Sequence, residues 1–351
     1  MTDEAASQLC HLRRLARLGL TRVRAISSYG WATLLARLPQ LTSLGRCDCL
    51  PEALGHLDMD RHVTRELLSL CHLDRHVTHV TRYQLSLGHV ECEAPIMESD
   101  LERITSLCPD LGRVKLVYRP QEADTERLDD NTRPHLTKFE RLTSLSELSL
   151  VSADFYNHSL FSAIKGLGPR RLTRLELVDC DEMNVNSLLI IGDSCPQLSS
   201  LTLSCCHFNV DPDERARINE ICSLQTPTRA LFKNLRIVNF KFSSPVHLIM
   251  MKLPLHFAHN LSSFSLDLFD QPLDDSFIST LMSWSSWQSL TSFRVTSCPG
   301  LGLMSANSVI GACPVISALG ALSSWGQVDN TQLSSFVKEI RSRNYDIRID
   351  G

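Results

Sequence analysis

Residues 172–198 read LTRLELVDCDEMNVNSLLIIGDSCPQL, and this stretch decides the fold. It opens on the phrase Leu-x-x-Leu-x-Leu, in which apolar and polar residues alternate as in a short strand with one buried face. Around Leu188 and Ile191 the apolar spacing changes toward the 3.6-residue period of a helix. The unit closes on Cys-Pro, and the phrase starts again at 198–203 as LSSLTL. We therefore predict a strand and a helix in each unit.

The phrase recurs along most of the chain, and its clean copies are spaced by 26 or 27 residues. Self-similarity at a fixed period of this size is typical of a solenoid, in which each unit packs only against its neighbours. The gap between Leu41 and Leu111 is too long for one unit, so we expect a further strand at Val80–Leu85 or Arg82–Leu87. The first residues of the phrases, before a degenerate copy at 344–349, are Leu15, Leu41, Leu111, Leu145, Leu172, Leu198, Leu235, Leu261, Leu290 and Ile316.

Two cysteine signatures accompany the strands. A Cys-Pro-x-apolar turn precedes the phrases that begin at Leu111, Leu198 and Ile316, where proline stops a helix and turns the chain into the next strand. A second cysteine follows the last apolar strand position by three residues. We expect this small side chain to pack in the narrow turn after the strand. The cysteines of the second signature are Cys49, Cys180, Cys206 and Cys298.

Together these signatures resemble the cysteine-containing leucine-rich repeat of F-box/leucine-rich-repeat proteins, in the ribonuclease-inhibitor-like superfamily. The resemblance implies an α/β fold, a right-handed leucine-rich-repeat solenoid with a parallel β-sheet on its concave face and helices on its convex face. We expect residues 1–351 to form a single domain of about eleven units. Polar insertions near 121–136 and 207–230 break the period, and we interpret both as long loops that could carry binding. No F-box is visible, because the repeats start within the first 15–20 residues.

Composition excludes several classes of protein. The net charge of −4 over 351 residues does not suit a polyanion binder, so no nucleic-acid partner is expected. No segment approaches the ~18 apolar residues of a membrane span, and the first residues lack a signal sequence. Thirteen cysteines without a signal sequence favour reduced thiols and a cytoplasmic or nuclear location.

Several groupings could carry chemistry, and each has a simpler interpretation. His72, His76 and His79 share one helical face and could bind a metal. The simpler interpretation is a local duplication in a solvated helix, because DRHVT occurs at both 60–64 and 74–78, and the role of the whole segment 56–89 stays open. Cys47–Cys49 and the adjacent pair Cys205–Cys206 have no second pair at zinc-site spacing. We therefore predict no metal, no cofactor and no enzyme activity.

The acidic and glycine residues between 274 and 302 are expected to have local structural roles and not a ligand-binding role. Asp274 or Asp275 is expected to cap a helix, and Gly300–Gly302 to form a turn. Trp284 and Trp287 are placed on that helix, where they would shield the convex side.

The best candidates for binding are the polar residues inside the strand phrases, because their apolar neighbours point into the core. The resulting face is basic at several strands and neutral at others, which suits a protein segment with some acidic character. The partner-binding residues predicted on the concave face are Arg113, Lys115, Arg174, Glu176, Thr202, Asn239, Lys241 and Arg294.

These observations favour a non-catalytic scaffold that binds another protein. The resemblance implies substrate recognition in a ubiquitin ligase, with ligase subunits as partners, supplied through an upstream module or a bridging subunit. Two alternatives stay open: an enzyme inhibitor, and a GTPase-activating leucine-rich-repeat protein. The identity of the partner and the oligomeric state are also left open.

Overall fold

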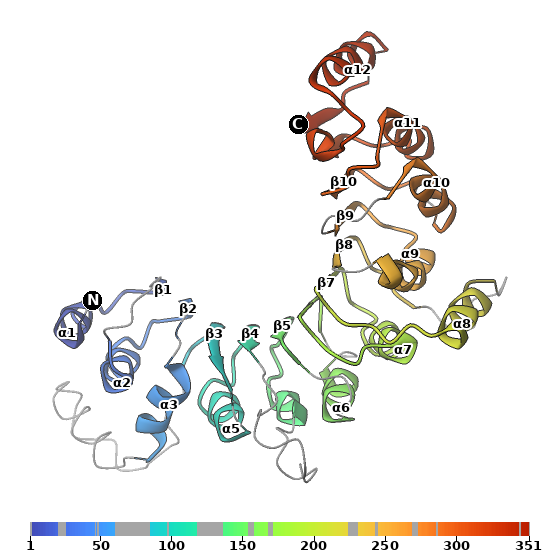
Figure 1. The fold of residues 1–351 in the computed structure, drawn as a ribbon. Coiled ribbons are helices and arrows are strands. Elements are labelled where there is room, and N and C mark those ends of the chain that lie inside the picture. The colour runs from blue at the N-terminus through green and yellow to red at the C-terminus, as the bar shows by residue number, and fades with distance from the viewer. Residues whose placement is uncertain are drawn as a thin grey trace. The chain divides into compact units, whose positions relative to one another are not determined.

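Short strands alternate with helices along the described parts of the computed structural model (Figure 1). The described residues are 2–19, 26–45, 47, 49–59, 85–96, 98–117, 136–153, 158–167, 171–223, 231–242, 245–268, 273–285, 287–343 and 345–350. They divide into two compact units, residues 1–172 and 173–351. The expectation of a single domain over 1–351 stays a prediction.

The described residues of the first unit form five strands. On Figure 1, helices α2, α3 and α5 lie along one side of these strands. Its elements are α1 (Asp3–Leu9), β1 (Arg17–Gly19), α2 (Ser28–Arg37), β2 (Ser43–Gly45), α3 (Leu50–Met59), β3 (His89–Pro95), α5 (Glu98–Leu107), β4 (Arg113–Val117), the 3-10 helix η2 (Leu136–Arg141), β5 (Glu147–Val151) and α6 (His158–Leu167).

The described residues of the second unit form seven strands, again with helices along one side (Figure 1). Its elements are β6 (Arg174–Val178), α7 (Val185–Ser194), β7 (Ser200–Ser204), α8 (Pro212–Ser223), β8 (Ile237–Phe242), η3 (Pro245–Met251), α9 (Lys252–Phe257), β9 (Ser263–Leu268), α10 (Asp275–Ser283), β10 (Ser292–Thr296), α11 (Leu303–Ala312), β11 (Ala318–Gly320), η4 (Leu322–Ser324), α12 (Asn330–Ser342) and β12 (Arg348–Asp350).

The strands follow chain order in the sheet, β1 to β5 in the first unit and β6 to β12 in the second, and the recorded pairs are parallel. Equivalent apolar positions stay in register, so that Leu175 faces Leu201 and Leu201 faces Val238 on neighbouring strands. All three side chains are buried at 1% exposure or less. A parallel sheet whose successive strands are joined through helices is the α/β leucine-rich-repeat solenoid that the phrase predicts, and the fold class is confirmed.

The turn after each strand explains the cysteine signature. The residue that follows β6 and β7, Asp179 or Cys205, has a positive φ and reverses the chain, and the next residue points back into the core. Cys180 and Cys206 occupy that second position with no exposed surface, and each thiol donates to the carbonyl two residues earlier, at 3.5 and 3.6 Å. Cys298 repeats the arrangement at 3.4 Å. Cysteine fits because it is small and supplies one weak donor.

A ladder of hydroxyl groups runs along the start of the strands. The second residue of the phrase is often Ser or Thr, and its hydroxyl donates to the backbone carbonyl of the equivalent residue one repeat earlier. The backbone N–H of the same residue donates to the same carbonyl. These side-chain bonds measure 2.9–3.1 Å and are Thr42 to Ala16, Ser146 to Gly112, Ser199 to Thr173, Ser262 to Arg236, Thr291 to Ser262 and Ser317 to Thr291.

Four sequence-based expectations need correction. The extra strand is β3 at His89–Pro95, because Val90 and Cys92 take the buried places in the sheet. Cys47 is 1% exposed, whereas Cys49 is half-buried, so Cys47 takes the core position in that repeat. The described part of the 207–230 insertion contains helix α8 instead of a loop.

Trp287 lies beyond the end of α10, is 2% exposed and packs against Phe264 inside the core. It therefore does not shield the outer side of the helix. The histidines at 72, 76 and 79 and the insertion at 121–135 lie outside the described residues.

Candidate functional site

The sheet face opposite the helices, called here the open face, carries the polar side chains of the strands. The second and fourth residues of β4 and β6 are buried in the core: Val114, Leu116, Leu175 and Leu177. The residues between them point the other way. All eight predicted partner-binding residues occupy such positions, Arg113 and Lys115 in the first unit and Arg174, Glu176, Thr202, Asn239, Lys241 and Arg294 in the second.

Arg113 is held in an ion pair on the open face of the first unit. Its Nε lies 2.7 Å from Oε2 of Glu147, and its Nη2 donates to Oε1 of the same carboxylate at 2.7 Å. Cα pairing places Glu147 directly beside Arg113 on the next strand. Because the Nε and Nη2 groups of the guanidinium both contact this carboxylate, Arg113 offers less charge to a partner than its sequence position suggests.

Lys241 and Asn239 also make contacts within the second unit. The Nζ atom of Lys241 lies 3.7 Å from Oδ2 of Asp267. The Oδ1 atom of the same carboxylate accepts from the hydroxyls of Thr296 at 2.7 Å and Ser297 at 3.2 Å. The amide of Asn239 donates to the Thr202 hydroxyl at 3.1 Å. These contacts fix the side chains and leave the middle of this face close to neutral.

Lys115 and Arg294 differ from these residues. Within the described part of the chain, neither side chain has an ion pair or a side-chain hydrogen bond. Lys115 lies between Glu91 and Ser149 on the neighbouring strands. Lys115 and Arg294 each offer a charge that the described chain leaves unpaired. Such a charge is the kind of group that contributes to recognition.

Two further residues of the open face were missed by the sequence analysis. His89 Nδ1 and Ser149 Oγ are buried and have no hydrogen-bond partner among the described residues; the same holds for Arg37 Nε and Ser285 Oγ elsewhere. A buried polar atom without a partner costs free energy, so such atoms call for an explanation such as water or a ligand. His89 escaped notice because the register of β3 was misplaced. Accepting Val and Cys in the phrase at 87–92 would have found it.

The electrostatics of His89 follow from its burial. Removal from water lowers the pKa of His89 below its ordinary value of 6.5, and nearby Arg113 lowers it further. The Glu91 carboxylate, 3.4 Å from Nε2, acts in the opposite direction and does not reverse the shift. The imidazole is therefore mostly neutral near pH 7.

Groups that could have formed a reactive site take structural roles instead. Asp274 caps α10 by accepting from Phe277 N, as predicted, and Asp275 accepts from Gly302 N at 2.9 Å, which starts the next helix. Burial raises the pKa of Cys108 and Cys195 to about 12, so both thiols stay protonated. In the searched ranges, no three His, Cys, Asp or Glu side chains converge as metal ligands would.

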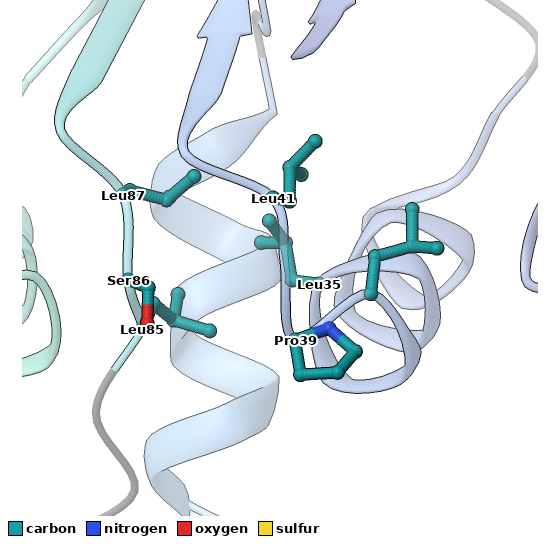
Figure 2. Close-up of a pocket in the computed structure, with 7 residues that line it drawn as sticks. Leu35, Pro39, Leu41, Leu85, Ser86 and Leu87 are labelled. Carbon is teal, nitrogen blue, oxygen red and sulfur yellow. The ribbon is translucent and has the colours of Figure 1, made fainter. Parts of the chain in front are cut away.

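A cavity of about 160 Å³ lies in the first unit (Figure 2). Figure 2 shows Leu35, Pro39 and Leu41, from the end of α2 and the approach to β2, around the same space as Leu85 and Leu87. Leu38 and Ser86 complete its lining. The lining holds no charged or nucleophilic group other than one serine hydroxyl, so it offers no arrangement for general acid–base chemistry.

Comparisons with known proteins were made for the whole chain. No family model matches it, and no curated protein sequence matches. Several solved structures resemble it. One of them is the crystal structure of the Rad7 and Elc1 complex in yeast, with 14% sequence identity, coverage of 93% of this chain and 84% of that chain, and a TM-score of 0.38. Because this TM-score is low, the fold is assigned from the sheet and helices described above and not from this similarity.

The helices of the described ranges were also compared with the length of a membrane span. None of them is long and apolar enough to cross a bilayer.

Proposed function

We propose that this protein is a non-catalytic scaffold that binds another protein through the open face of its sheet. The observation that carries the proposal is the position of the unsatisfied polar groups. Lys115, Arg294, the Nδ1 atom of His89 and the hydroxyl of Ser149 lie on this face without partners in the described structure. In each unit, a repeat sheet that presents such groups on the face opposite its helices is suited to binding a partner protein.

The absence of catalysis is part of the same proposal. The reactive side chains of the described repeats hold the fold together: cysteines close turns, and aspartates cap helices. Nothing comparable supports a role as GTPase activator or inhibitor, which needs one side chain positioned for an enzyme's active site.

A narrower proposal concerns the biological setting. The Leu-x-x-Leu-x-Leu-x-x-Cys and Cys-Pro-x-Leu signatures resemble those of F-box/leucine-rich-repeat proteins, which recognise substrates for ubiquitin ligases. By that resemblance, we propose substrate recognition in a ligase, with contact to the ligase through another subunit or segment. A cytoplasmic or nuclear location would follow.

The test compares face variants with matched helix-side variants. Tagged wild-type chain, Lys115→Glu/Arg294→Glu, and Lys165→Glu/Lys338→Glu are purified from the native cell, and the co-eluting proteins are quantified by mass spectrometry. Lys165 on α6 and Lys338 on α12 are exposed and away from the open face. Equal melting temperatures would establish that all three chains are folded.

We expect at least one stoichiometric protein to be lost from the face variant and kept by the helix-side variant. The same set of proteins in all three samples would contradict the binding role of the open face. Cullin-type ligase subunits in the wild-type sample would support the narrower proposal, and their absence beside a retained partner would contradict it.

A further inference from the structure

An exposed isoleucine stands on the open face of the second unit. Ile237 begins β8 and is 40% exposed, and it is the large apolar residue exposed within a strand among the described residues. The residues paired with it on either side are Ser200 on β7 and Ser263 on β9. An apolar side chain that projects from a floor of small polar residues can enter an apolar pocket or contact an apolar side chain of a partner.

Arg294 provides the second feature of this surface. It lies on β10, is exposed, and has no ion pair within the described ranges. A Cβ atom added to Gly320 on the next strand would lie 3.1–3.4 Å from the Cβ, Cγ and Cδ atoms of Arg294, so the stem of the arginine rests above Gly320. The absence of a side chain at position 320 therefore leaves room for Arg294 and for an approaching ligand.

The register fixes the spacing between the two features. Ile237, Ser263 and Ser292 form one row across β8, β9 and β10, and Arg294 lies two residues further along β10. With strands about 4.8 Å apart and about 3.3 Å per residue, the two Cα atoms are about 12 Å apart. An extended segment covers that distance in about four residues.

The charges between and around these residues set the direction in which an extended segment lies on this face. Glu176 lies on β6, two strands before Ile237, whereas Arg294 lies two strands after it. Lys241 and Asp267 oppose each other's charge in the same region. On β6 the charge of Glu176 is opposed by that of Arg174 on the same face, so a carboxylate would be attracted most strongly at the Arg294 end.

We infer that β8–β11 bind an extended segment of a partner protein that carries an apolar residue and an Asp or Glu about four residues apart. The apolar residue contacts Ile237, and the carboxylate accepts hydrogen bonds from the Arg294 guanidinium. This inference rests on the proposed function, because it specifies what the open face of the second unit recognises.

The test uses a phage-displayed library of random 12-residue peptides, panned on the immobilised full chain. Selected peptides are then synthesised, and their Kd values are measured by fluorescence polarisation against wild type, Arg294→Glu, Ile237→Ser and the control Lys338→Glu. We expect selected peptides to combine the two residue types at the stated spacing. Their binding should weaken about tenfold or more with Arg294→Glu and with Ile237→Ser, and stay unchanged with Lys338→Glu.

A charge exchange sharpens the experiment. Replacing the acidic residue of a selected peptide by Lys should restore binding to Arg294→Glu while weakening binding to wild type. Circular dichroism melting of each variant separates loss of binding from loss of folding.

A Ser265→Arg variant, which blocks the floor between the two features, distinguishes two kinds of failure. One outcome is that Ser265→Arg abolishes binding of the selected peptides although these peptides show no preference for an acidic residue. That outcome would overturn this inference and would leave the proposed binding at the open face intact. Peptides that bind Ser265→Arg as tightly as wild type would count against the open face of this unit as well. Failure to select any peptide would also overturn the inference.

Discussion

Arg113 on β4 and Glu147 on β5 form a two-point ion pair on the open face, with both nitrogen–oxygen distances at 2.7 Å. Thirty-four residues separate them in the chain, and the parallel register places them side by side. Lys115, two residues away on the same strand, has no such partner in the described structure. The two cations of β4 therefore have different roles: Arg113 stabilises the fold, and Lys115 is available to a partner.

The ion pair predicts unequal effects on stability. Arg113→Ala should lower the free energy of unfolding by up to about 1 kcal/mol, a small value because the Arg113 side chain is 52% exposed. Lys115→Ala should change it by less than about 0.5 kcal/mol. Urea denaturation followed by circular dichroism measures both. Equal losses in the two variants would contradict the division of roles.

The alternation along β7 predicts a sharp contrast between neighbours. Leu201 has no exposed surface, so Leu201→Ala should cost about 2–5 kcal/mol and Leu201→Asp should unfold the adjoining repeats. Ser204, on the open face of the same strand, should accept Ser204→Asp with a loss below about 1 kcal/mol. Thermal melting compares the three variants. A folded Leu201→Asp chain would show that the register of this repeat is wrong.

The hydroxyl ladder makes a measurable contribution to stability. Thr291 donates to the Ser262 carbonyl at 2.9 Å, and Thr291→Val removes that bond while keeping the branched shape. We expect a loss of about 0.5–1 kcal/mol in urea denaturation, since the bond is exposed. Thr331→Val, at an exposed position of α12, serves as the control and should be neutral within about 0.3 kcal/mol. A neutral Thr291→Val would indicate that the ladder is incidental.

Burial of His89 predicts a pH dependence of stability. Its pKa in the folded state is lowered below 6.5 by desolvation, so below pH 6.5 the unfolded chain binds more protons than the folded chain. The free energy of unfolding should therefore fall as the pH drops from 6.5 toward the folded pKa, and this part of the slope should vanish in His89→Asn. The exposed His259→Asn is the control and should keep the slope. Parallel pH curves for wild type and His89→Asn would disprove the assignment.

Much of the fold could be predicted from the sequence because the repeat signal is local. The alternation at 172–177 and 198–203 specifies one buried face, and proline in the Cys-Pro turns specifies where helices stop. The structure confirms both, and the helix around Leu188 and Ile191 is α7. The strand after Leu87 was misplaced because Val90 and Cys92 stand where leucine was sought.

The candidate site was less accessible to sequence reasoning. The alternation assigns Arg113, Lys115, Lys241 and Arg294 to one face but is silent about their partners. Those partners come from other repeats: Glu147 for Arg113 and Asp267 for Lys241.

The sequence by itself determined the repeat, its strand–turn–helix order and the face to which each strand residue points, because these depend on the 2.0 and 3.6 periods of neighbouring residues. Only the tertiary structure decided which charges are paired, which buried polar atoms lack partners, and where Ile237 and Arg294 lie relative to each other. Those properties depend on contacts between strands about 30 residues apart in the chain, which the register of the sheet sets and no local pattern encodes.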